Sequence, residues 1–203
     1  MIFGTVFTGQ VKTQNKQYIE TKVFCLIIPL AVVTTLLVTE VVANGRRGLE
    51  IKSNRTSIIA ATIRPLISLP CLFAIVAYIV NYDTMQWLLI PALLAIPLFV
   101  YVWFYFGKTT KSERFVREQF GKQFGLYVMP NWLKPYDLKS KFEELKKIYS
   151  SNFGTSDWKE KIIDMPYYNE EFPLLYCLTS LENTINNNAE TEKLLKKIAE
   201  TEQ

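Results

Sequence analysis

The chain has 203 residues, 49% of them hydrophobic and 21% charged, and its 23 Lys and Arg against 19 Asp and Glu give a formal net charge of +4. Histidine is absent, which excludes the commonest general base and the commonest transition-metal ligand. Residues 1–107 hold 8 of the basic and 4 of the acidic residues, whereas residues 108–203 hold 15 of each. Because the basic excess lies beside long apolar segments, it indicates membrane topology, and no nucleic-acid partner is predicted.

The N-terminal segment has the pattern of β-strands. Apolar Ile19 and Val23 flank charged Glu20 and Lys22, an alternation typical of a strand with one buried face. We therefore predict a small, antiparallel, strand-rich domain over residues 1–55. With helices predicted for the rest of the chain, this domain makes the fold α+β.

Residues 23–43 leave two interpretations open. The segment is apolar and long enough to cross a bilayer, so it could be the first of three transmembrane helices. However, it is rich in Val, Ile and Thr, which favour strands, and Pro29 divides it into two shorter runs. The Asn44-Gly45 pair then separates it from another apolar run, which is typical of a β-hairpin. The strand interpretation is preferred, and the three-helix arrangement remains the alternative.

Two apolar segments with a short polar link follow the strands. Residues 86–107 include about twenty uncharged positions, the length that a helix needs to cross a hydrocarbon core of about 30 Å. Residues 64–82 form the other apolar segment, and the link between the two runs only from Asn81 to Met85. A link this short requires antiparallel neighbours. We therefore predict a transmembrane helical hairpin over residues 56–107, with spans at 64–82 and 86–107.

The distribution of charge predicts the topology of this hairpin. With two spans, both termini and every Lys and Arg lie on one side, which the positive-inside rule makes cytoplasmic. The Lys-, Asn- and Ile-rich composition favours a bacterial inner membrane. Aromatic and basic residues near the span ends are the predicted interface anchors, and the basic ones would also meet anionic lipid headgroups: Arg64, Trp87, Trp103, Lys108, Lys111, Arg114 and Arg117.

Residues 108–203 are predicted to form an α-helical cytoplasmic domain. Thr110 and Glu113 have the spacing of a capping box, and apolar Val116, Phe120 and Phe124 follow at helical intervals. Several amphipathic segments then alternate with loops rich in proline and aromatic residues. The aromatic side chains near these loops are explained either by core packing or by contact with a partner protein; the candidate contacts are Trp132, Trp158, Tyr167 and Tyr168.

No arrangement of residues in the chain predicts catalysis. The adjacent pairs Glu143-Glu144 and Glu170-Glu171 point in different directions on a helix and have charged surroundings. The cysteines are far apart in sequence and resemble small hydrophobic residues, and no glycine-rich phosphate loop occurs. We therefore predict no enzyme activity, no cofactor and no metal site. The three cysteines are Cys25, Cys71 and Cys177.

These expectations favour a non-catalytic structural or assembly subunit of a larger membrane complex. Its partners would be other membrane-protein subunits or copies of itself. A homo-oligomeric channel or membrane-disrupting effector is the first alternative, although the spans lack charged positions for a pore. An enzyme that modifies lipids at the membrane interface is a weaker one.

Overall fold

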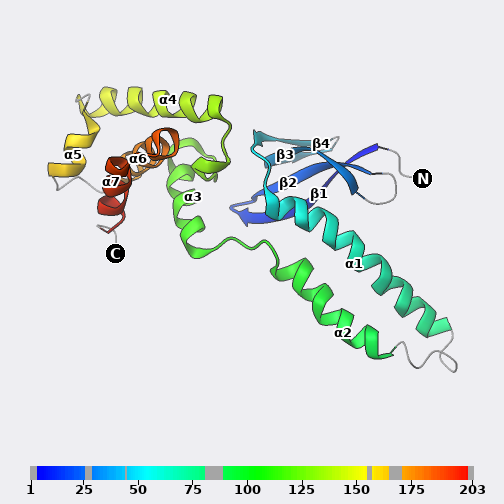
Figure 1. Ribbon diagram of the computed structural model, residues 1–203. Helices are drawn as coiled ribbons and strands as arrows, with labels where there is room; N and C mark the ends of the chain where they lie inside the picture. Colours follow the sequence, from blue (N-terminus) through cyan, green and yellow to red (C-terminus); the bar gives the residue numbers. More distant parts are fainter. Residues whose placement is uncertain are drawn as a thin grey trace. The chain divides into compact units, whose positions relative to one another are not determined.

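The computed structural model describes residues 4–25, 29–43, 45–80, 89–154, 157–164 and 171–200. The chain divides into two compact units, Met1–Thr109 and Thr110–Gln203. The described strands and two apolar helices belong to the first unit, and the second unit is helical (Figure 1). The predicted α+β class and the predicted antiparallel sheet are confirmed.

The strands form one antiparallel sheet in the order β1-β2-β3-β4, so each strand pairs with its neighbours in sequence. A two-residue turn joins β1 to β2 at Asn15 and Lys16, whose φ angles are 47° and 64°. Positive φ at both positions is what a type I′ hairpin turn requires. The strands are β1 (Gly4–Gln14), β2 (Gln17–Cys25), β3 (Pro29–Val42) and β4 (Gly45–Ile51).

The hairpin predicted near Asn44-Gly45 is present. Val42 at the end of β3 pairs with Gly45 at the start of β4, while Asn44 lies outside the described residues. Most of the segment 23–43 is strand, because β2 ends at Cys25 and β3 begins at Pro29. The alternative in which this segment is a transmembrane helix is therefore wrong. The β-branched residues and the turn that follows favour strands, and they decided the structure although the length and hydropathy of the segment suit a transmembrane helix.

One face of the sheet packs against helix α1 (Arg55–Val80). Ile19 of β2 pairs with Leu37 of β3, and both are fully buried. Side chains alternate along a strand, so Glu20 points to the opposite face. There its Oε2 lies 3.0 Å from Nε of Arg46, and this carboxylate raises the pKa of Arg46.

Helix α1 is longer than predicted at its N-terminal end. The first span was predicted to begin at residue 64, whereas residues 56–63 belong to the same continuous helix. Asn54 caps the helix, because its Oδ1 accepts a hydrogen bond of 3.1 Å from the backbone N–H of Ser57. The helix also contains Pro65 and Pro70.

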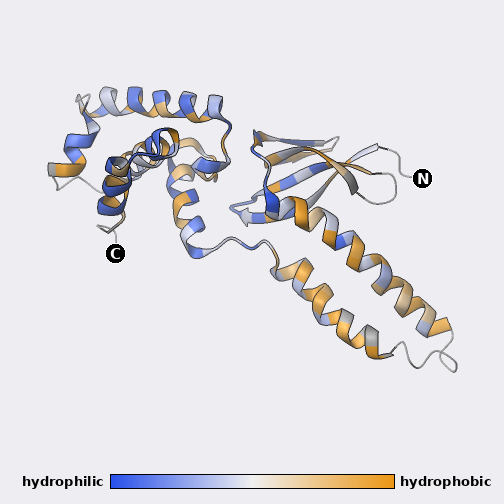
Figure 2. Cartoon of the chain, viewed as in Figure 1, coloured by the Kyte–Doolittle hydropathy of each residue, from blue (hydrophilic) through white to orange (hydrophobic). Residues whose placement is uncertain are grey.

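Helix α2 (Leu89–Val100) lies beside α1 and continues into the five-residue π-helix η2 (Tyr101–Tyr105) (Figure 1). Among the described helices, α1 is long and apolar enough to cross a bilayer, and α2 is shorter. In Figure 2 both helices are coloured mainly as hydrophobic. Trp87 lies outside the described residues.

The second unit is built around helix α6. Every residue from Leu174 to Glu182 is buried, which places this helix at the centre rather than on the surface. Helices α3, α4 and α7 pack against α6, and α7 also packs against α5. The helices are α3 (Lys111–Phe124), the 3-10 turn η3 (Pro130–Trp132), α4 (Pro135–Phe153), α5 (Trp158–Asp164), α6 (Phe172–Asn186) and α7 (Ala189–Glu200).

The ends of these helices follow local sequence signals. The capping box predicted at Thr110 is confirmed: its Oγ1 accepts a bond of 3.3 Å from the N–H of Glu113, whose carboxylate accepts one of 3.1 Å from the N–H of Thr110. Helices α3, α4 and α6 end in left-handed residues, at Gly125, Gly154 and Asn187.

Candidate functional site: the junction between the sheet and the apolar arm

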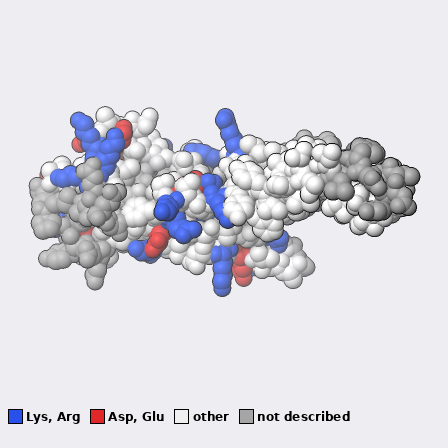
Figure 3. Space-filling model, turned by 90° about the horizontal axis from the view of Figure 1, so that it is seen from below, with Lys and Arg blue, Asp and Glu red and all other residues white. Residues whose placement is uncertain are grey.

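The described parts of α1 beyond Arg64, together with α2 and η2, form an apolar arm (residues 65–80 and 89–105). No described residue in it is charged, as the uncharged projection in Figure 3 shows. The second unit exposes few large hydrophobic side chains, namely Tyr136 and Ile163 among its described residues. The arm exposes many, and the most accessible are Phe73 (75%), Val80 (72%), Leu94 (72%), Ile79 (70%) and Ile90 (69%).

The arm starts where α1 leaves the sheet, and the contact there is very close. A Cβ atom on Gly9 of β1 would overlap the carbonyl oxygen of Ser57 and would lie 2.8 Å from the Cβ of Ala61. Gly9 also has a φ of 74°. The hydroxyl of Ser57 donates a hydrogen bond of 2.8 Å to the carbonyl of Gly9 and accepts one of 2.7 Å from Thr21. Small residues thus allow the helix and the strand to bond directly.

Arg64 links three elements at this junction. Its Nη1 donates a hydrogen bond of 2.8 Å to the carbonyl of Gln10 in β1. Its Nε donates one of 3.2 Å to the carbonyl of Val102 in η2. The guanidinium also lies over the ring of Trp103, 5.5 Å from the ring centroid. One side chain of α1 therefore connects the helix both to the sheet and to η2, where the chain returns from the far end of the arm.

The charge of Arg64 is buried without a carboxylate. The residue is only 8% exposed, and the ion pairs between described residues do not include it. Backbone carbonyls and an aromatic ring are therefore its observed partners, and both stabilise a cation without neutralising it. Arg64 therefore keeps its positive charge in these contacts.

The returning chain after η2 is bonded to β1. The backbone N–H of Lys12 donates a bond of 2.7 Å to the carbonyl of Gly107, and its Nζ donates one of 3.4 Å to the carbonyl of Lys108. The hydroxyl of Thr109 donates a bond of 3.3 Å to the carbonyl of Thr13. A bulge in β1 makes these bonds available, since its register with β2 shifts on both sides of Val11.

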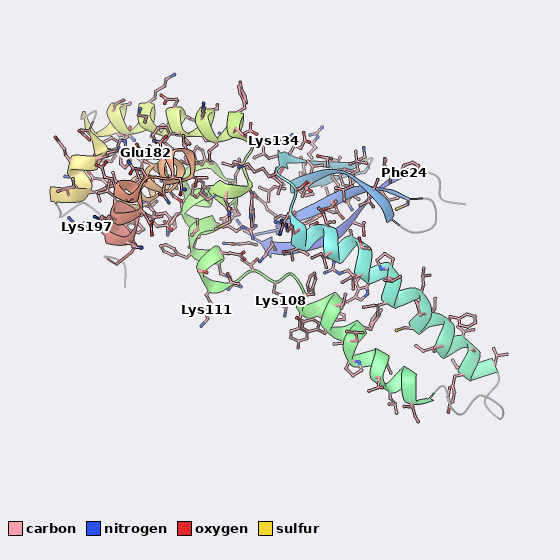
Figure 4. All side chains as sticks on the ribbon, viewed as in Figure 1. Phe24, Lys108, Lys111, Lys134, Glu182 and Lys197 are labelled. Atoms are coloured by element: carbon pink, nitrogen blue, oxygen red, sulfur yellow. The ribbon has the colours of Figure 1, made fainter. Side chains whose placement is uncertain are left out.

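The predicted anchors do not all occupy equivalent places. Lys108 lies at the junction (Figure 4), and so does Trp103. Nζ of Lys108 is 4.3 Å from the ring centroid of Tyr105. Arg64 is at the junction too, but it points inward. Lys111 and Arg114 are exposed on α3, in the second unit.

Arg117 is not an interface anchor, because it is fully buried inside the second unit. Its Nε donates a hydrogen bond of 2.7 Å to the carbonyl of Tyr127, and its guanidinium lies over the ring of Trp132. Burial lowers the pKa of Arg117 to about 10, against the opposing effect of Glu113. Its role is to join α3 to the loop that follows it.

The four residues predicted to contact a partner also differ in their burial. Trp158 is buried in the second unit, so core packing explains it and partner contact does not. Trp132 is half-buried beneath Arg117. Tyr167 and Tyr168 lie outside the described residues.

Reactive groups do not gather within the described part of the chain. No set of three or more Cys, Asp or Glu there could hold a metal ion. Glu143 and Glu144 are exposed on α4. Cys25, Cys71 and Cys177 are free thiols, and burial raises the pKa of Cys177 well above its usual range. The junction can bind and orient another group, but the carboxylates and thiols named here supply no nucleophile or base to it.

No protein-family model matches the chain, and neither curated proteins nor solved structures match it. The functional argument consequently rests on the residues of this chain.

Sequence reasoning missed the part of α1 that contacts the sheet. Ser57, Ala60, Ala61 and Arg64 are all buried, and they recur at the i, i+3, i+4 and i+7 spacing of one helix face. This stripe of small residues ending in an arginine was visible in the sequence. The asparagine at position 54 was the corresponding signal for the start of the helix.

Proposed function

We propose that the protein is a non-catalytic structural or assembly subunit of a membrane complex, anchored by α1 and α2 as a transmembrane hairpin. The observation that carries this proposal is the apolar arm. Large hydrophobic side chains exposed in such density are costly in water, because each buried Leu, Ile or Phe gains roughly 1.5–3 kcal/mol on leaving it. Lipid or the apolar surface of a partner protein is the medium that such an arm requires.

The dimensions of the arm are compatible with insertion. At about 1.5 Å per residue, residues 65–80 of α1 extend about 24 Å from the junction. A hydrocarbon core is about 30 Å thick, so this length approaches that of one crossing. Arg64 and Lys108 then lie at one interface, and both flanking segments lie on the same side, which we assign to the cytoplasm of a bacterial inner membrane.

The structural role follows from what the arm offers to its surroundings. A pair of helices has too little lateral surface to enclose a substrate, and its described residues carry no charge for an ion path. Its sides can instead pack against other membrane helices, including copies of itself. The sheet and the helical unit would then be the parts that organise partners at the membrane surface.

Fractionation followed by mass measurement tests this function. The full chain should sediment with membranes, resist extraction at alkaline pH, and be released by mild detergent. Native mass spectrometry of the detergent particle should show additional subunits or several copies of the chain. A chain that stays in the supernatant without detergent contradicts the anchor, and a strictly monomeric particle without partners contradicts the assembly role.

A further inference from the structure

One end of the sheet exposes apolar side chains to its surroundings. The large hydrophobic residues that are exposed on the described strands are Val6, Phe24, Val32, Val33 and Val41. All except Val41 lie at the end of the sheet where β1 begins, β2 ends and β3 begins, and Phe24 marks this end in Figure 4. We call these four residues the apolar tip. Their exposed fractions run from 37% at Phe24 to 54% at Val33.

The apolar tip has exposed side chains on both faces of the sheet. Val6 and Val32 each pair with Val23 of β2, so these two side chains share one face. Phe24 directly follows Val23, and successive side chains of a strand point to opposite faces. A protein docked flat on the sheet would cover only one of these faces. A medium that surrounds the end of the sheet, such as lipid, would cover both.

No charged side chain interrupts this end of the sheet. The sequence contains no charged residue before Lys12, and none between Lys22 and Glu40. The sequence that joins β2 to β3 at residues 26–28 reads Leu-Ile-Ile, although these positions lie outside the described residues. Links between strands are usually rich in Gly, Pro, Asn, Asp and Ser. The composition therefore suits contact with lipid, where an unpaired charge would be costly.

Helix α1 runs toward the same end of the sheet. Its first turn lies close to Val11, because a Cβ atom on Gly107 would meet both Val11 and Thr56. One turn further along the helix, Ala61 lies against Gly9. The helix thus runs in the opposite sense to β1, toward the beginning of that strand, and Figure 1 shows β2 ending on the side toward which α1 extends. The apolar arm and the apolar tip therefore lie on the same side of the first unit.

We propose that the apolar tip inserts into the headgroup and upper acyl region of the bilayer that the arm crosses, which gives the sheet its own contact with the membrane. This inference rests on the proposed transmembrane anchor and names the lipid surface as the partner of the sheet. The tip must stay shallow, because an open sheet edge has backbone groups that are costly in the hydrocarbon core. The arm and the tip together would fix the orientation of the sheet on the membrane.

Quenching of fluorescence by brominated lipid measures the depth of the tip in the full chain. Phe24→Trp places a reporter in the tip and keeps an aromatic side chain there. The emission of the added tryptophan is the difference between this variant and the unmodified protein. Both are reconstituted into phosphatidylcholine vesicles that have bromine either close to the headgroup or near the end of the acyl chains. Bromine close to the headgroup should quench the added tryptophan more strongly than deep bromine.

Charge variants on one strand make the test specific to the tip. Val33→Asp, combined with Phe24→Trp, should abolish the quenching, because the carboxylate would have to leave water. Val33→Leu should retain it. The matched control is Val41→Asp, since Val41 is 58% exposed and lies at the other end of β3. This control should leave the quenching unchanged.

The native thiol of Cys25 gives a second measurement that needs no added tryptophan. Cys25 is the last residue of β2 and is a half-buried free thiol. In vesicles, Val33→Asp should accelerate the reaction of Cys25 with a charged, water-soluble maleimide, measured on the modified peptide by mass spectrometry. Val41→Asp should leave this rate unchanged.

Each contrary result has a distinct meaning. If the protein floats with the vesicles but bromine does not quench the added tryptophan, the lipid contact of the tip is overturned and the anchor remains. Quenching and Cys25 reactivity that do not respond to Val33→Asp overturn it too. An added tryptophan that is shielded from acrylamide in water, yet is not quenched by brominated lipid, assigns the tip to a protein surface instead. A chain that fails to float with the vesicles overturns both proposals.

Discussion

Replacing Arg64 by methionine tests whether the junction depends on the hydrogen bonds of this side chain. Methionine keeps much of the apolar stem of arginine but donates no hydrogen bond. The carbonyls of Gln10 and Val102, which accept bonds of 2.8 and 3.2 Å, would each lose a donor. An unsatisfied buried carbonyl costs roughly 1–3 kcal/mol, so the two together cost about 2–6 kcal/mol.

Removal of a buried charge acts in the opposite direction. The guanidinium is desolvated at 8% exposure, and replacing a buried ion by an apolar side chain recovers part of that penalty. We therefore expect Arg64→Met to lower the free energy of unfolding of the first unit by about 2 kcal/mol, towards the lower end of the range. The carbonyl losses dominate because the charge already has favourable partners.

The assay is guanidinium-induced unfolding of the full chain in mild detergent, followed by far-ultraviolet circular dichroism and by tryptophan emission. The matched control is Arg47→Met, because Arg47 is 73% exposed and its ion pair with Glu40 has a separation of 3.7 Å. An exposed pair of this kind contributes about 0–1 kcal/mol, so the control should change little. An Arg64→Met variant as stable as the unmodified chain would refute the reasoning.

Four further changes have defined outcomes. Gly9→Ala should lower the unfolding midpoint of the first unit, because its Cβ would overlap the backbone of α1, whereas Gly45→Ala has open space and should have little effect in the same denaturation series. Glu182→Gln should destabilise the second unit by roughly 1–3 kcal/mol in thermal unfolding, since it weakens a half-buried ion pair of 2.8 Å with Lys159; unchanged melting would contradict this. Leu72→Arg should shift the chain from the membrane fraction towards the supernatant in sedimentation, because a charge at the centre of a span costs about 2.5–3.5 kcal/mol. Burial raises the pKa of Tyr18 above 10.0, so its contribution to stability is complete below pH 10.0 and is lost as pH rises through the folded-state pKa; Tyr18→Phe should flatten this decline in pH-dependent unfolding.

Local signals predicted the elements well where both partners of an interaction are close in sequence. The capping box at Thr110 and Glu113 spans three residues, and the β3–β4 hairpin depends on the residues of one turn. Strand preference also decided the segment 23–43, although its length suggested a helix. The turn at Asn15 and Lys16 was missed because it lacks the glycine that usually marks such turns.

The interior of the junction could not be predicted in this way. Arg64 and Arg117 each lie close to an apolar segment in the sequence, which predicts an exposed anchor, yet both side chains are buried. The partner of Arg64 at Gln10 is 54 positions away, and only the folded chain brings them together. Trp158 shows the same limit, because its sequence does not distinguish a core position from an exposed one.

Helix α1 is one continuous element that belongs to both the sheet and the apolar arm. Ser57 and Arg64, within its first ten residues, are bonded to β1, and its remaining sixteen residues form part of the arm, with no break at Arg64. In the proposed bilayer, a change in the tilt of the arm must therefore rotate the sheet by the same angle. Bilayer thickness, which sets helix tilt through hydrophobic mismatch, would thereby control the direction in which the sheet faces the cytoplasm.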